Sequence, residues 1–110
     1  MKIENLSSIQ TEQNHNGTVS LKRLIEQGEE AGRVATLNYA WLESGMSLDP
    51  HVHEDGNEYY LFLEGEGQMK IGNETGAVKE DDFVFVPAKQ EHSVVNNSKA
   101  VLRFITLRTY

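Results

Sequence analysis

The stretch DPHVHEDGNEYYLFLEGEG, Asp49 to Gly67, decides how this sequence is interpreted. It sets His51 and His53 two residues apart, follows them with Glu58, and continues into a strongly apolar run that ends in glycines. On an extended strand, residues two apart share a face and lie about 6.5 Å from each other. Two imidazoles at that spacing can bind one metal ion at about 2.1 Å from each ring nitrogen. The stretch therefore predicts a metal-binding site at the head of an apolar strand.

The same stretch contains a turn that would bring a carboxylate to the imidazoles. A Gly56-Asn57 turn favours a reversal of the chain after His53, and an antiparallel return would place Glu58 beside both histidines. The alternative is a pair of histidines in an exposed polar loop, because H-x-H alone is a short motif that recurs by chance.

A second stretch, EDDFVFVPAKQEHSVVNN, places one more histidine at the start of a strand. An acidic turn leads into the apolar run Phe83 to Val86, Pro87 ends that run, and His92 opens the next strand with Asn96 four residues later. If both stretches lie in one barrel, His92 completes a set of three imidazoles and one carboxylate. The alternative is a half-exposed strand histidine without a ligand role.

Length, composition and charge narrow the class of protein. The chain of 110 residues is enough for one domain with one core. No apolar run approaches the ~20 residues of a membrane span, and the N-terminal residues have no apolar signal region, so we expect a soluble cytoplasmic protein with no membrane partner. The absence of cysteine leaves imidazole, oxygen and thioether as metal ligands. The formal net charge of −7 argues against nucleic acid as a partner.

The remainder of the chain is patterned as short β-strands. Residues 1–20 are polar and aperiodic, and they predict an N-terminal arm or edge strand ahead of a barrel over residues 21–110. Short apolar runs rich in β-branched and aromatic residues recur about every dozen residues, which predicts an all-β sandwich or barrel. The predicted strands are residues 33–43, 58–65, 68–72, 82–87, 92–96 and 100–107, and Leu21 to Ile25 fits a strand or a helix.

Together the two stretches resemble the cupin superfamily. The first matches the first cupin motif, G-x5-H-x-H-x4-E-x6-G, at every specified position, and the second matches the second motif, G-x5-P-x-G-x2-H-x3-N, except at its two glycines. The matching residues are Gly45, His51, His53, Glu58 and Gly65 in the first motif and Pro87, His92 and Asn96 in the second, with Asp81 and Lys89 at the two glycine positions. Because such a glycine commonly takes φ > 0, we expect an altered loop at Lys89, beside the histidine.

The resemblance implies a double-sheet jelly roll with a metal ion held inside it by His51, His53, Glu58 and His92. Three neutral imidazoles and one carboxylate leave a divalent ion with a net charge near +1 and, if it is octahedral, with two open positions. Mn, Fe, Ni, Co and Zn all fit such donors. We expect a metal-dependent dioxygenase, decarboxylase or isomerase acting on a small oxygenated metabolite. The alternative is a non-catalytic module that binds or senses a sugar or carboxylate around a structural metal.

Four further residues are candidates for the substrate pocket. Tyr60 and Phe62 share strand parity with the predicted glutamate ligand, and Asn96 shares it with the third histidine. Arg103 interrupts an apolar strand, where it lies either on the outer face or inside as an anchor for an anion. For the predicted strand over residues 33–43, the alternation of side chains does not show which of its two faces lines the barrel. No general base is evident, since His15 lies in the polar arm.

The strand that carries the predicted glutamate ligand is apolar on both faces. Tyr59, Leu61 and Leu63 lie on the face opposite Glu58, so something must cover that face. The N-terminal arm could cover it, but a second subunit would bury more apolar surface. We therefore expect a homodimer.

Overall fold

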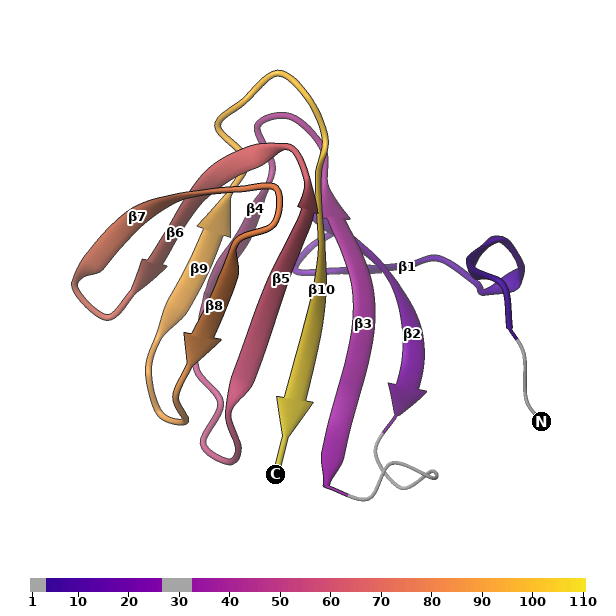
Figure 1. Ribbon diagram of the computed structural model, residues 1–110, viewed down its shortest axis with the longest axis horizontal. Helices are drawn as coiled ribbons and strands as arrows, with labels where there is room; N and C mark the ends of the chain where they lie inside the picture. Colours follow the sequence, from indigo (N-terminus) through magenta and orange to yellow (C-terminus); the bar gives the residue numbers. More distant parts are fainter. Residues whose placement is uncertain (1–3, 27–32) are drawn as a thin grey trace.

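A computed structural model describes residues 4–26 and 33–110 of the protein. Within these ranges the chain forms strands and one short 3-10 helix, η1 (Leu6–Ser8), capped by Asn5 (Figure 1). The strands are β1 (Glu12–Asn14), β2 (Val19–Glu26), β3 (Val34–Leu42), β4 (Ser47–His51), β5 (Glu58–Glu64), β6 (Glu66–Ile71), β7 (Glu74–Lys79), β8 (Phe83–Val86), β9 (His92–Val95) and β10 (Leu102–Thr109).

Two antiparallel sheets make up the fold. One has six strands in the order β1-β2-β3-β10-β5-β8, and the other has four in the order β4-β9-β6-β7. The core lies between them, because the buried residues alternate along the strands of both sheets. On β10, for example, Leu102, Phe104 and Thr106 are buried, while Arg103 and Ile105 between them are half-exposed. The predicted all-β double-sheet jelly roll is confirmed.

The apolar runs of the sequence coincide with strands. β3, β5, β8, β9 and most of β6 and β10 fall within the predicted ranges, and Leu21 to Ile25 lies in strand β2 rather than in a helix. β7 was not predicted, because only its Val78 is buried and the sequence therefore lacks an apolar pattern. It forms because every one of its residues pairs with β6.

The expected hairpin between the first two histidines and Glu58 is wrong. β4 pairs with β9 in the four-stranded sheet, whereas β5 pairs with β10 and β8 in the six-stranded sheet. The segment 52–57 instead crosses from one sheet to the other. Gly56 in this crossing has φ +75°, and a Cβ there would lie 1.5 Å from the carbonyl oxygen of Thr109 at the end of β10. A glycine is therefore needed at this position because the backbone passes close to β10, and not because the chain forms a two-residue hairpin turn.

The N-terminal residues lie at one edge of the larger sheet. β1 pairs with β2, with Glu12 opposite Leu21, and β2 in turn pairs with β3. Figure 1 shows this arm on the side away from β8. Among the described residues, no helix has the length and apolarity needed to cross a membrane.

Candidate metal centre and its cavity

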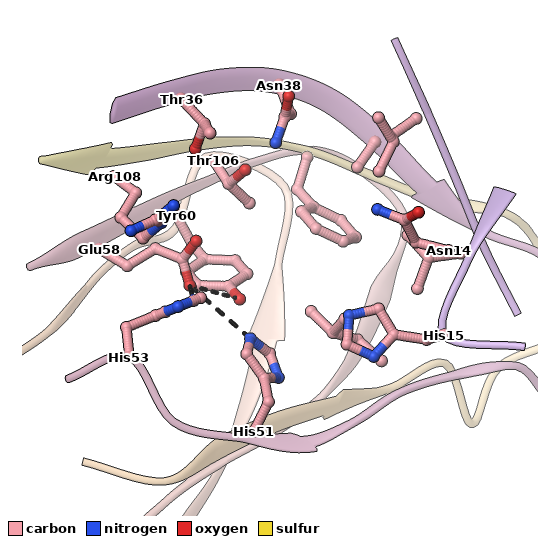
Figure 2. Close-up of a pocket in the computed structure, with 15 residues that line it drawn as sticks. Asn14, His15, Thr36, Asn38, His51, His53, Glu58, Tyr60, Thr106 and Arg108 are labelled. Carbon is pink, nitrogen blue, oxygen red and sulfur yellow. Dashed lines mark hydrogen bonds and ion pairs between the residues drawn. The ribbon is translucent and has the colours of Figure 1, made fainter. Parts of the chain in front are cut away.

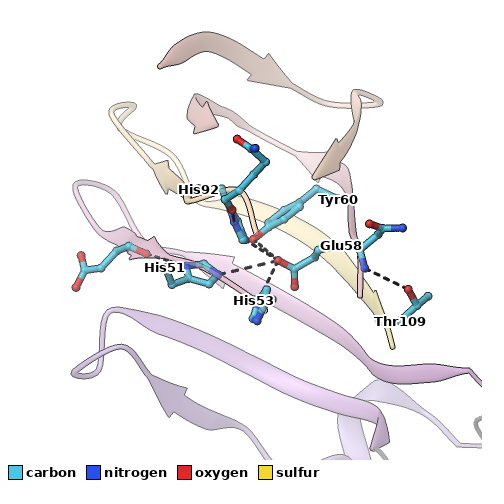
Figure 3. A network of polar contacts seen from close by, with 9 residues as sticks. His51, His53, Glu58, Tyr60, His92 and Thr109 are labelled. Carbon is cyan, nitrogen blue, oxygen red and sulfur yellow. Dashed lines mark hydrogen bonds and ion pairs between the residues drawn. The ribbon is translucent and has the colours of Figure 1, made fainter. Parts of the chain in front are cut away.

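Three imidazoles and one carboxylate converge between the two sheets (Figure 3). His51 ends β4, His53 follows it in the crossing segment, Glu58 begins β5, and His92 begins β9. One potential ligand atom from each of the four lies within 4.8 Å of the others. His51 and His92 are also directly paired across β4 and β9. The structure therefore brings together all four residues predicted as metal ligands, although they come from both sheets.

One carboxylate oxygen is the centre of this cluster. Glu58 Oε1 lies 2.8 Å from His92 Nε2, 3.5 Å from His53 Nε2 and 4.0 Å from His51 Nε2. The hydroxyl of Tyr60 donates a hydrogen bond to the same oxygen at 3.1 Å. Three Nε2 atoms thus face one oxygen, which is the arrangement of donor atoms that a single cation needs.

The opposite ring nitrogens hold two of these imidazoles in the ligating tautomer. His51 Nδ1 lies 2.8 Å from the carbonyl oxygen of Asp49, and His92 Nδ1 lies 3.0 Å from that of Gln90. A carbonyl only accepts hydrogen bonds, so each Nδ1 carries a proton, and in the neutral imidazole Nε2 is then the nitrogen whose lone pair can bind a metal. The Nε2 atom of His53 is buried without a hydrogen-bond partner, and a bound metal ion would give it one through coordination.

The pKa values follow from burial and from these contacts. Burial favours the neutral form of Glu58, but the imidazoles of His53 and His92 beside its carboxylate together outweigh burial and lower the pKa of that carboxyl to about 2. Burial is the largest single effect on His92 and opposes its protonation, yet the hydrogen bond to Glu58, the contact with the Gln90 carbonyl and the charge of Glu58 together outweigh burial and raise the pKa of that imidazole. Burial lowers the pKa of His51. Glu58 is therefore ionised at neutral pH, as a metal ligand must be.

The loop before His92 retains the conformation that the glycine of the second motif would favour. Lys89 has φ +70°, so the expected rearrangement at this position is wrong. Its backbone N–H donates to the carbonyl oxygen of His53 at 2.8 Å, and Ala88 N–H donates to Asn57 Oδ1 at 3.1 Å. These bonds join the loops that carry the ligands, and they offset the cost of about 1 kcal/mol that φ > 0 imposes on lysine.

Beside the four residues is a cavity of about 170 Å³ (Figure 2). Most of its wall belongs to the inner face of the six-stranded sheet, from β1, β2, β3, β5 and β10, with further residues from β4, the β1–β2 turn and the segment 52–57. The lining residues are Asn14, His15, Val19, Leu21, Thr36, Asn38, Ala40, Leu48, His51, His53, Glu58, Tyr60, Phe104, Thr106 and Arg108.

Strand register arranges the sheet wall of this cavity in rows that cross β5, β10 and β3. Because β10 pairs with both neighbours, each of its inward-facing residues Phe104, Thr106 and Arg108 lies between one residue of β5 and one of β3. The two polar rows lie at the end of the cavity nearest the imidazoles, and the apolar row lies next to them, farther from the imidazoles. The rows are Glu58, Arg108 and Thr36; then Tyr60, Thr106 and Asn38; then Phe62, Phe104 and Ala40.

A family model for the cupin domain matches residues 40–108 of the chain. The protein is a cupin. Over 85 residues, 77% of this chain and 68% of the other, it is 34% identical to an uncharacterized protein of Methanocaldococcus jannaschii. It is 33% identical over 88 residues to dimethylsulfoniopropionate lyase DddW of Ruegeria pomeroyi, which covers 80% of this chain but only 57% of the lyase. Among solved structures, a predicted oxalate decarboxylase from Thermotoga maritima superposes with a TM-score of 0.91 at 24% identity, covering 98% of both chains.

The four residues predicted for the substrate pocket of this cupin have different locations. Tyr60 lines the cavity. Phe62 is fully buried beneath it in the core. Asn96 is buried too, and its amide donates to the carbonyl oxygens of Leu42 and Ala100, so it holds the backbone. Arg103 lies on the outer face, with its guanidinium 5.5 Å from the Trp41 ring centroid, which leaves Tyr60 alone of the four in the described lining.

The sequence interpretation missed most of the polar lining. Thr36 and Asn38 lie on β3, where parity left both faces open. Thr106 lies near the end of the predicted strand 100–107, and Arg108 lies just past it. The parity of β10 would have indicated the last two, since Thr106 and Arg108 follow the buried Phe104 at intervals of two.

His15 lies against the candidate metal centre rather than remote from it in the arm. The turn between β1 and β2 has left-handed residues at His15, Asn16 and Gly17, with φ of 52°, 59° and 83°. This turn carries the imidazole of His15 to a ring-centroid distance of 5.2 Å from His51 (Figure 2). No periodicity of the sequence indicates this position, because it depends on β1 pairing with β2.

Proposed function

We propose that this cupin binds one divalent transition metal ion through His51, His53, Glu58 and His92 and acts as a metal-dependent enzyme on a small oxygenated metabolite. The observation that carries the proposal is the convergence of three Nε2 atoms on Glu58 Oε1 at the wall of a cavity. The unpartnered Nε2 of His53 supports it, because a buried imidazole nitrogen without a partner is costly unless something ligates it. Mn, Fe, Ni, Co and Zn all suit these donors.

The residues around the candidate centre support catalysis more than a purely structural metal. When bound, such an ion would polarise a carbonyl or carboxylate oxygen of a substrate. Three of the four proposed ligand residues, His51, His53 and Glu58, line an open cavity, so a substrate can reach the ion. The buried hydroxyl of Tyr60 donates to Glu58 Oε1 and holds the carboxylate in one orientation. Structural metal sites, by contrast, are closed by protein ligands on all sides.

Within the three reaction types considered, the relatives favour the decarboxylase type. The names of dimethylsulfoniopropionate lyase and of the predicted oxalate decarboxylase both refer to small carboxylates. One of these names is that of a lyase and the other is that of a decarboxylase. The lyase is much longer than the region matched, and the decarboxylase is under 25% identical, so these names support the reaction class and do not assign it.

The test is to replace Glu58 by Gln, which keeps the shape of the side chain and removes its charge. Purified protein without a histidine tag is first assayed for metal by elemental analysis, and turnover is then measured on a panel of small carboxylates and hydroxy-ketones, with oxygen uptake recorded in parallel. For an enzyme, we expect weaker metal binding and turnover reduced by about a hundredfold or more.

The matched control is Glu64→Gln, which neutralises an exposed carboxylate at the other end of the same strand and should leave turnover unchanged. If no compound is turned over and ligand affinity is only modestly altered by Glu58→Gln, the cupin is a binding module and the enzymatic proposal fails.

We also propose that the protein is a homodimer joined through the outer face of β5 and β8. Leu61, Phe83 and Phe85 are 40%, 62% and 46% exposed on this face. Tyr59 lies among them, with its ring centroid 5.3 Å from that of Phe85. β1 pairs at the opposite edge of the sheet, so the arm that could have covered this face lies elsewhere. A second copy is the occupant that suits a face with so many aromatic and so few charged side chains.

Leu61→Glu should convert the dimer to a monomer, because a charge at the centre of an apolar interface must be desolvated without a partner. Light scattering at micromolar concentration should give twice the chain mass of 12.4 kDa for the wild type and the single mass for the variant. Val95→Glu is the control, since Val95 is similarly exposed at 38% but lies on the four-stranded sheet. A wild-type mass equal to one chain would refute the dimer.

A further inference from the structure

Arg108 extends the charged part of the cavity beyond the candidate metal ligands. It lies on the inner face of β10, directly between Glu58 on β5 and Thr36 on β3, and its side chain lines the cavity (Figure 2). Among the described lining residues it is the only lysine or arginine. An arginine inside a barrel is costly to desolvate, so its position at the cavity wall requires an explanation.

Among the residues that the structure describes, none provides an anion for this guanidinium. The nearest carboxylate along the row is that of Glu58, but its oxygen is turned toward the three imidazoles and the hydroxyl of Tyr60. Within the described part of the chain, Arg108 forms no ion pair. Its fork of N–H donors is therefore available to a ligand in the cavity, and a carboxylate matches that fork with two parallel hydrogen bonds.

A second polar group of the wall also lacks a partner. The Oδ1 atom of Asn38 is buried and accepts no hydrogen bond, although it lines the same cavity one row further in. Beside it on β10 lies Thr106, which is 7% exposed. An amide oxygen only accepts hydrogen bonds, so a buried Oδ1 without a partner costs free energy unless a donor, such as water or a hydroxyl group of the ligand, completes its hydrogen bonding. The unpartnered amide and the unpaired guanidinium therefore lie on the same wall.

The charge balance of the cavity points to the same class of ligand. The charges of Glu58 and Arg108 cancel. When the imidazoles are neutral, a bound divalent ion would therefore leave the described lining with an excess charge near +2. An anion bound in the cavity offsets that charge. The volume limits its size: a cavity of about 150 Å³ accommodates benzene, so the ~170 Å³ here suits about seven non-hydrogen atoms.

From these observations we infer that Arg108 is the anchor for a carboxylate of the ligand, with Asn38 and Thr106 beside it, and that the cavity selects small carboxylates able to place a second oxygen at the metal. This inference rests on the proposed function for the metal and adds to it the substrate class and the recognising residue. Arg108 positions and selects the ligand; the reacting atoms lie at the other end of the molecule it binds.

The experiment is a calorimetric titration of the protein with malonate, which has two carboxylates and seven non-hydrogen atoms, and with its neutral counterpart malonamide. The wild type loaded with Mn²⁺ should bind malonate at least about tenfold more tightly than malonamide. Arg108→Gln should weaken malonate binding by about tenfold or more, the effect of losing a charge-assisted hydrogen bond, and should leave malonamide binding unchanged. The malonate affinity of Arg108→Lys should fall between those of the wild type and Arg108→Gln, because lysine keeps the charge but lacks the two parallel N–H donors of the guanidinium.

Arg103→Gln is the matched control, since Arg103 lies on the same strand but on the outer face, and its malonate affinity should stay within about twofold of wild type. Circular dichroism and metal content of each variant establish that the barrel and the metal site are intact.

Malonate binding that Arg108→Gln leaves unchanged, or a wild type that prefers malonamide, would overturn the proposal that Arg108 anchors a carboxylate. A wild type that takes up no metal counts against the proposed metal function instead, and the contribution of Arg108 is then read from the same titration of metal-free protein.

Discussion

The two ends of the barrel interior are built on the same strands but have opposite character. At one end, the rows across β5, β10 and β3 carry glutamate, arginine, tyrosine, threonine and asparagine around an open cavity. At the other end, β10 and β3 bring Leu102 against Leu42, and both are fully buried. Here even Gly67 of β6 lies close: a Cβ on it would lie 2.8 Å from the Leu102 side chain.

The difference shows how a chain this short holds a reactive site. The packed end buries apolar surface at close to crystal density, which is what stabilises the domain. The polar end leaves donor and acceptor atoms of His53 and Asn38 without partners, which costs stability but leaves those atoms for a metal ion and a ligand. Substitutions at the two ends should therefore affect different measurements, and three predictions test that separation.

The largest effect is expected at the packed end. Leu102→Ala removes most of a side chain with no exposed surface and leaves a cavity between the two sheets, so the free energy of unfolding should fall by about 2–5 kcal/mol. Urea unfolding of the metal-free protein measures this loss. The folded fraction should still take up one metal ion per chain, because the ligands are at the other end. A loss of metal affinity in folded Leu102→Ala would break the separation.

At the polar end the expectation is reversed. His51→Ala removes one of four ligands and should lower metal affinity by about a hundredfold or more, while the metal-free barrel unfolds at nearly the wild-type urea concentration. His15→Ala sharpens the test, since the His15 ring lies 5.2 Å from that of His51 without belonging to the set of four. That variant should retain its metal. Stoichiometric metal in His51→Ala, measured by elemental analysis, would show that the assigned ligands are wrong.

The smallest of the three expected effects is the pH dependence of metal affinity, which involves only the polar end. The pKa of Glu58 is about 2, so its carboxylate stays ionised, and loss of metal at mildly acidic pH must come from protonation of the imidazoles. Because its pKa is raised, His92 binds its competing proton first as the pH falls, while His51, whose pKa is lowered, follows at lower pH.

Metal affinity should therefore decrease by about tenfold or more between pH 7 and pH 5, measured by competition with a chelator of known pH dependence. The far-ultraviolet circular dichroism of the metal-free protein should remain that of a folded barrel over the same interval. An affinity that is constant down to pH 4 would exclude imidazole ligands.

The sequence alone determined which residues could form the site and which strands could exist. The spacing of His51, His53 and Glu58 and the position of His92 after a strand-ending proline were enough to name the four residues that the structure brings together. Period-two patterns found the buried strands, because a buried face requires regular apolar residues. Fold class and family could be predicted for the same reason: they depend on local pattern and on fixed spacing.

Only the tertiary structure decided how these elements face one another. Local pattern does not reveal which strand pairs with which, so the expected hairpin was wrong and the ligands meet across two sheets instead. β7 has almost no apolar pattern because it is held by its hydrogen bonds to β6 at the edge of the sheet.

The same limit applies to the cavity. The face of β3 that carries Asn38 became the inner one because β10 pairs beside it, and Arg108 rather than Arg103 points inward because the register of β10 is set by both of its neighbours. His15 reached the site through pairing of β1 with β2. Each of these outcomes depends on contacts between residues far apart in the chain, and strand periodicity alone cannot choose the face that such contacts bury.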